Sequence, residues 1–209
     1  MINDFKKLPV GKWNEIRDIQ ADTAIEDNHI KIVAILSILS DIPEEDLYDM
    51  KLEEFSKMTG EMEFLTKPVP EVPVCDRYRI GGYDLKLVRD LKELTASQFI
   101  DYQTFIKDTD IYIVELLSIF LIPKGKTYCK DYDVADVQRV IRENLSIADA
   151  QAIAAFFLSL FKVLYRSMQI YLTKMLKKMK KKMKVEEATQ IEEALRNLEK
   201  SGPGLDLLM

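Results

Sequence analysis

The sequence contains very few of the residues that build catalytic and metal centres. It has one histidine, His29, and two cysteines, Cys75 and Cys129, which lie far apart along the chain. Neither cysteine has a second Cys or a His close by, so no zinc-binding spacing occurs. A single histidine cannot build a metal site, and no Ser or Cys near it forms a known nucleophile motif. We therefore expect no catalytic residue, metal or cofactor, and we predict that the protein is not an enzyme.

Long hydrophobic runs are also missing. The longest uncharged run, Ala150 to Phe161, lies between Asp149 and Lys162 and is too short to span a bilayer. The N-terminus lacks an apolar signal region. Two isolated cysteines are more typical of reduced thiols in a reducing cytosol than of a disulfide. We expect a soluble, cytoplasmic protein without a membrane span.

An excess of positive charge is absent as well. The 209 residues carry a formal net charge of −5, with 47% hydrophobic and 31% charged residues. This balance is ordinary for a folded protein, and the length allows one domain or two small ones. An acidic chain is not, as a whole, an electrostatic nucleic-acid binder. Such a role would fall to a local cluster of lysines near the C-terminus.

Two segments resemble ligand-binding loops but lack the residues that these loops need. Gly125-Lys126-Thr127 looks like the end of a phosphate loop, but the position that needs another glycine is Phe120. Asp131, Asp133 and Asp136 resemble part of a calcium loop, without its glycine or its final glutamate. We interpret the aspartates as the start of a helix and expect no nucleotide or calcium site.

Glycine and proline do not occur between Gly125 and Gly202, so nothing local stops a long C-terminal helix from Ser146 to about Glu199. Its apolar positions alternate steps of four and three, which is typical of a coiled coil. About fifty residues of helix would span roughly 75 Å. The helix therefore either bends back near Lys184 or projects and meets a partner. The apolar positions are Ala150, Ala154, Phe157, Phe161, Leu164, Met168, Tyr171 and Met175.

Lysines and methionines alternate in the last part of this helix. A basic amphipathic helix can bind a protein partner, a nucleic acid or a membrane surface, or its lysines can simply pair with the acidic residues that follow. Methionine favours a protein partner because its flexible side chain adapts to varied apolar surfaces. The predicted partner surface is Leu172, Met175, Leu176, Met179 and Met183. The cations expected to contact phosphates or an acidic partner are Lys174, Lys177, Lys178, Lys181 and Lys182.

The first half of the chain predicts helices and one β-hairpin. A core helix is expected from about Ala24 to Leu39, followed by a turn that Asp41 can cap. Three prolines between residues 66 and 76 predict an extended segment. Two alternating runs around a Gly-Gly pair predict a hairpin over residues 78–87. Between the turn and the prolines, an amphipathic helix is expected with the inner face Leu52, Phe55, Met58, Met62 and Leu65.

Local start signals mark the helices of the second half. Thr95 and Gln98 predict a capping box, with Leu94 and Phe99 as its hydrophobic staple. Further helices are expected at 111–122, before Pro123, at 134 to about 142, capped by Asp133, and from Ser146, which pairs with Asp149.

These elements predict a mainly α fold with one small β-hairpin and a long C-terminal helix, divided into four regions. Residues 1–65 form an N-terminal helical hairpin unit, and residues 66–94 form a Pro-rich linker and the β-hairpin. Residues 95–172 form a second helical unit, and residues 173–209 a basic, then acidic, helical tail. We expect the protein's own helices to cover the C-terminal helix as far as Leu172.

Several segments together resemble the tail assembly chaperones of tailed bacteriophages and prophages. They are Ile35-Leu36-Ser37-Ile38-Leu39, Ile-Pro-Glu-Glu-Asp-Leu at 42–47, Leu52-Glu53-Glu54-Phe55, Phe64-Leu65, and Glu93 to Asp101, where a threonine precedes Gln-aromatic. The resemblance implies a small helical protein in the host cytoplasm that coats aggregation-prone helices of a tape-measure protein and helps recruit tail tube subunits.

Two other functions stay open at this point. One is a structural component of the virion, such as an internal or portal-associated helical protein. The other is nucleic-acid binding through the lysines between Lys174 and Lys184. In each case we expect a protein or nucleic-acid partner, with self-association as a further option.

Overall fold

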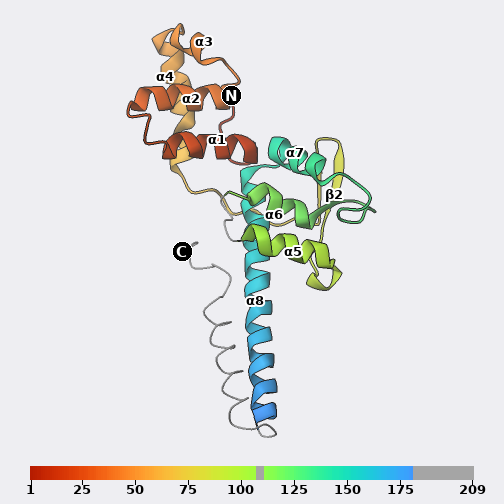
Figure 1. Ribbon diagram of the computed structural model, residues 1–209. Helices are drawn as coiled ribbons and strands as arrows, with labels where there is room; N and C mark the ends of the chain where they lie inside the picture. The colour runs from red at the N-terminus through yellow and green to blue at the C-terminus, as the bar shows by residue number, and fades with distance from the viewer. Residues whose placement is uncertain (107–110, 181–209) are drawn as a thin grey trace.

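A long helix, α8 (Ile147–Lys180), runs through the structure, a computed structural model that describes residues 1–106 and 111–180 (Figure 1). Residues 77–144 gather around its first half, whereas residues 28–61 lie beyond its N-terminal end. The predicted fold class, mainly α with a small β element and a long C-terminal helix, is confirmed. The predicted helix start is also correct, because the Asp149 backbone N–H donates to Ser146 Oγ at 3.1 Å, and Ser146 Oγ donates to Asp149 Oδ2 at 2.6 Å.

Four α-helices and a 3-10 helix form the N-terminal part. They are α1 (Val10–Ala21), α2 (Asn28–Ser40), α3 (Glu44–Tyr48), α4 (Leu52–Glu61) and η1 (Met62–Thr66). The sequence predicted a helix that starts at about Ala24, whereas α2 starts at Asn28. The reason is the cap, because the Asp27 side chain accepts a hydrogen bond from the His29 backbone N–H at 2.8 Å.

Asp41 ends a helix instead of starting one. Its backbone is left-handed, with φ 58°, and its N–H donates to Ser37 O at 2.9 Å, which closes the last turn of α2. Its carboxylate accepts from Lys12 Nζ at 2.6 Å and so links α2 to α1. The predicted cap of the following helix was wrong, since α3 starts after Pro43.

Different faces of α2 pack into two different hydrophobic clusters. Ile35 and Leu39 belong to the main core, whereas Val33 and Leu36 belong to a smaller cluster with Leu47 of α3. Partly buried side chains of α4 and η1 pack on this smaller cluster, namely Phe55, Met58 and Met62.

One residue of the predicted inner face of α4 lies outside. Leu52 is 79% exposed, because it is the first residue of α4 and no other element covers that end of the helix. The helical period predicted which side of α4 is hydrophobic, but it did not predict which residues on that side other elements bury.

The Pro-rich segment leads into a sheet. Residues 67–76 form no helix or strand, as their prolines predict. Strands β1 (Arg77–Ile80) and β2 (Tyr83–Leu87) form the predicted antiparallel hairpin. The turn has Gly81 at φ 51° and Gly82 at φ 80°, which glycine adopts without strain. A Cβ at Gly81 would lie 2.8 Å from Val140 Cγ1, so glycine also lets the hairpin tip pack against α7.

A third strand was not predicted. β3 (Leu121–Pro123) pairs antiparallel with β2, so the sheet order is β1-β2-β3. The preceding helix, α6 (Ile113–Phe120), therefore ends two residues before the predicted end at Ile122. Pairing with β2 extends the backbone after Phe120, whose carbonyl accepts from the Val88 N–H at 2.9 Å.

The remaining helices start where local signals predicted. η2 (Leu91–Glu93) precedes α5 (Ala96–Phe105), which has the full capping box of Thr95 and Gln98. α7 (Val134–Asn144) starts with Asp133 accepting from the Ala135 N–H at 2.9 Å, as predicted, and ends slightly beyond the predicted Arg142. α6 lies between α5 and α7 and packs on the first half of α8 (Figure 1).

Candidate functional site

The first half of α8, residues 147–161, is held in the core by aromatic stacking. The rings of Phe157 and Phe120 stack with centroids 3.6 Å apart, and those of Phe161 and Tyr102 stack at 3.7 Å. Each pair joins α8 to a different helix, α6 in the first case and α5 in the second. Burial raises the pKa of Tyr102 above its ordinary value, so this ring stays neutral. We call residues 147–161 the buried half of α8.

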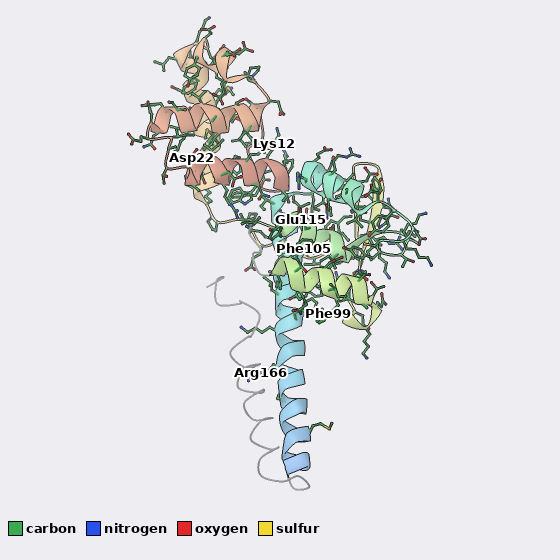
Figure 2. The ribbon with its side chains drawn as sticks, in the orientation of Figure 1. Lys12, Asp22, Phe99, Phe105, Glu115 and Arg166 are labelled. Carbon is green, nitrogen blue, oxygen red and sulfur yellow. The ribbon has the colours of Figure 1, made fainter. Side chains whose placement is uncertain are left out.

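Among the side chains that the structure describes, Phe161 is the last buried one on α8. Beyond it, Lys162, Arg166 and Lys174 are exposed, and so are Ile170 at 51% and Met175 at 43%. The helix continues well past the other elements in Figure 1, and Arg166 lies on this part in Figure 2. The expectation that the protein's own helices cover α8 as far as Leu172 stays a prediction, because the side chains of Leu164, Met168 and Tyr171, which continue the buried face, lie outside the described residues. We call residues 162–180 the projecting half.

The projecting half carries charge of one sign only. It contains six basic residues and no acidic one, whereas the whole chain has a net charge of −5. Met175 follows Phe161 by two heptads, so it continues the face that is buried higher up the helix. The projecting half thus presents hydrophobic side chains within a basic surface.

The predicted partner and cation residues fall into three groups. Lys174 and Met175 are exposed on the projecting half, as a partner surface requires. A second group lies on the backbone of α8 within that half: Leu172, Leu176, Met179, Lys177 and Lys178. The third group, Met183, Lys181 and Lys182, lies outside the described residues. The roles of all ten residues stay predictions.

An exposed hydrophobic pair on α5 was not predicted. Phe99 is 47% exposed and lies close to where α8 leaves the core (Figure 2), and the next residue, Ile100, is exposed as well. The sequence predicted that Phe99 forms a hydrophobic staple with Leu94. Instead the polar Gln98 is buried, because its Nε2 donates to the Ile119 carbonyl at 2.6 Å. The inward positions are therefore Gln98 and Tyr102, one helical turn apart.

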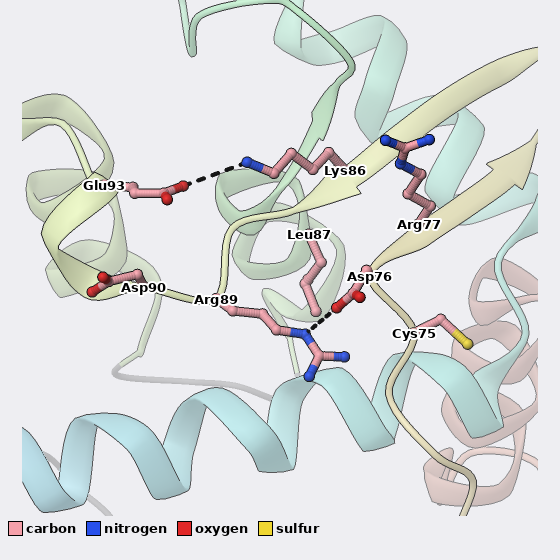
Figure 3. A pocket seen from close by; sticks show the side chains of 8 residues that line it. All are labelled: Cys75, Asp76, Arg77, Lys86, Leu87, Arg89, Asp90 and Glu93. Carbon is pink, nitrogen blue, oxygen red and sulfur yellow. Dashed lines mark ion pairs between the residues drawn. The ribbon is translucent and has the colours of Figure 1, made fainter.

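An open groove of about 670 Å³ lies beside the hairpin (Figure 3). Arg89 Nε lies 2.7 Å from Asp76 Oδ1, and Lys86 Nζ lies 3.5 Å from Glu93 Oε2. Arg89 Nη2 also donates to the Val74 carbonyl at 2.6 Å. These contacts tie the linker to the end of β2, and the sheet to η2. The charged residues of the groove are therefore explained by the ion pairs that hold these elements together. No nucleophile in the groove is paired with a base.

The single histidine and the two cysteines do not gather at one place in the described part of the chain. His29 is exposed at the start of α2, and Cys75 and Cys129 are exposed, free thiols. Within residues 1–106 and 111–180, no three His, Cys, Asp or Glu side chains gather closely enough to hold a metal ion. No helix in that part of the chain is both long and apolar enough to cross a membrane.

Comparison of the chain with protein families, curated proteins and solved structures finds no match. The site therefore has to be interpreted from its own geometry. Its distinctive feature is a basic helix that extends beyond the core and keeps hydrophobic side chains exposed.

Proposed function

We propose that the protein is a non-enzymatic assembly protein of a tailed bacteriophage, a tail assembly chaperone that binds helical segments of a tape-measure protein. The projecting half of α8 is the observation that supports this proposal. Ile170 and Met175 remain exposed there among cations, although the same helix buries its hydrophobic face completely at Phe157. Exposed hydrophobic side chains on a regular helix are suited to pairing with another amphipathic helix.

The dimensions and chemistry of the projecting half fit a helical partner. Nineteen residues from Lys162 to Lys180 span roughly 28 Å at 1.5 Å per residue, which is enough for several turns of a paired helix. Methionine adapts to varied hydrophobic surfaces, as a chaperone for many similar helices requires. The cations favour a partner with acidic residues beside its hydrophobic face.

Co-expression with the long tape-measure-like product of a neighbouring gene tests the proposal. We expect the two proteins to co-purify and the tape-measure-like protein to stay in solution only when this chain is present. Replacing Ile170→Glu and Met175→Glu together should abolish co-purification while leaving the circular dichroism spectrum unchanged, because both side chains are exposed.

Ile30→Glu is the matched control. Ile30 is a hydrophobic residue of similar exposure on α2, far from the projecting half. This variant should retain the partner. The proposal is wrong if the two proteins neither co-purify nor change each other's solubility, or if Ile30→Glu weakens binding as much as the α8 variant.

Nucleic-acid binding is a second candidate function, and the run of cations without an anion favours it. Binding to DNA or RNA would weaken steeply with added salt and disappear when Lys174, Lys177 and Lys178 are replaced by Gln. The third interpretation, a structural component of the virion, is separated from the chaperone by mass spectrometry of purified particles. A chaperone is absent from the finished particle, and a structural component is present.

A further inference from the structure

The far end of the N-terminal part has the opposite charge to the projecting half of α8. Between Glu44 and Glu54 there are six acidic residues and one lysine, and all seven are exposed. Two large hydrophobic side chains are exposed among them, Tyr48 at 62% and Leu52 at 79%. We call α3 and the first turn of α4 the acidic corner.

The acidic corner and the projecting half lie at opposite ends of the molecule (Figure 1). The corner is thus too remote from the projecting half of its own chain to pair with it. Two projecting halves cannot pair readily with each other either, since each carries six positive charges and no negative one. A second copy of the chain, however, brings an acidic corner wherever it brings a basic helix.

We propose that the projecting half of α8 docks on the acidic corner of a second copy of this chain. Opposite charges orient the two surfaces, and the hydrophobic residues Tyr48 and Leu52 on one side meet Ile170 on the other, which lies between Arg166 and Lys174 on one face of α8. The contact joins two different surfaces, so two copies in antiparallel orientation form it twice and close a dimer, while one-way contacts extend a chain.

This contact does not depend on the proposed chaperone function, because it requires only the purified protein. If both hold, the second copy protects the projecting half until a tape-measure helix displaces it. The same Ile170 would then be buried in either complex, and the two complexes would exclude each other.

Charge reversal at each surface tests the contact by sedimentation velocity on the full chain. The corner variant carries Glu44→Lys, Glu45→Lys, Glu53→Lys and Glu54→Lys, and the helix variant carries Arg166→Glu, Lys174→Glu, Lys177→Glu and Lys178→Glu. We expect the unchanged protein to self-associate at low salt and to dissociate as salt is added. Each variant alone should be monomeric, because its two surfaces then carry the same sign.

A mixture of the two variants is the decisive sample. A reversed corner meets a reversed helix, and the two unchanged surfaces meet each other, so association should return. The control is Glu15→Lys with Asp18→Lys, two exposed carboxylates on α1, which should associate like the unchanged protein. Thermal unfolding followed by circular dichroism checks that each variant is folded.

Three results would overturn the proposal. The first is an unchanged protein that stays monomeric at low salt and high concentration. The second is loss of association in the helix variant but not in the corner variant, which would mean that another anionic segment binds the helix. The third is failure of the mixed variants to associate while both are folded.

Discussion

The two halves of α8 have the same helical pattern and opposite environments. In the buried half, Phe157 and Phe161 stack on rings from α6 and α5. In the projecting half, Met175 continues the same face and is exposed. A heptad pattern therefore identifies the hydrophobic face of a helix but does not show whether the chain itself supplies the partner for it.

The largest expected effect comes from removing a ring from the buried half. Phe157→Ala should lower the free energy of unfolding by about 3–5 kcal/mol, because it leaves a cavity against Phe120 in a close-packed core. Urea denaturation followed by circular dichroism measures the loss. A change below about 1 kcal/mol would mean that the buried half is not the centre of the core.

A smaller loss is expected from the helix that covers the buried half. Gln98→Ala removes the hydrogen bond to the Ile119 carbonyl and half of the capping box, so it should cost about 1–3 kcal/mol in urea denaturation. Gln103→Ala, at an exposed position of the same helix, should change the stability by less than about 0.5 kcal/mol. Equal effects of the two variants would contradict the inward position of Gln98.

Alkaline pH should lower the free energy of unfolding. Burial raises the pKa of Tyr78 from 10.0 to about 12, and it raises that of Tyr102 as well. Above pH 10 the unfolded chain loses these protons first, so stability is complete below pH 10 and falls as the pH rises through the folded value. Thermal unfolding across this range measures the fall.

Tyr102→Phe tests the origin of this alkaline loss. Phenylalanine keeps the ring that stacks on Phe161 but has no proton to lose, so the decline in stability should become shallower. Tyr48→Phe, at an exposed position on α3, should leave the decline unchanged. A decline that is identical in all three proteins would assign the alkaline effect to other groups.

The smallest effect is expected in the projecting half. Ile170→Gln and Met175→Gln should each change the free energy of unfolding by less than about 0.5 kcal/mol, because neither side chain is buried in the core. The same urea titrations as for Phe157→Ala give a direct comparison at one helix. A loss approaching that of Phe157→Ala would mean that the projecting half is part of the core.

Features determined by neighbouring residues could be predicted from the sequence. The caps at Thr95, Asp133 and Ser146 and the turn at Gly81-Gly82 were predicted correctly, since each depends on residues within a few positions. The strand β3 could not be predicted, because its three residues are extended only by pairing with a distant β2. The exposure of Leu52 could not be predicted either, because it depends on which other elements lie beside the first turn of α4.

The candidate site was predicted in part. Lysines and methionines in the sequence pointed to the last part of the C-terminal helix, where Lys174 and Met175 are indeed exposed. The start of that surface was placed at Leu172, because the apolar pattern continues without a break past Phe161. Only the lengths of α5 and α6, which belong to the tertiary structure, determine where the cover ends.

The contact between Leu8 and Ile147 has a consequence for the order of events during synthesis. The Ile147 N–H donates to the Leu8 carbonyl at 2.8 Å, and the Val10 N–H donates to the Leu145 carbonyl at 2.9 Å. The segment before α1 is therefore anchored by residues that are translated much later than it is. We expect α1 to remain undocked until the start of α8 has emerged, so that folding of the core waits for residues far along the chain from α1.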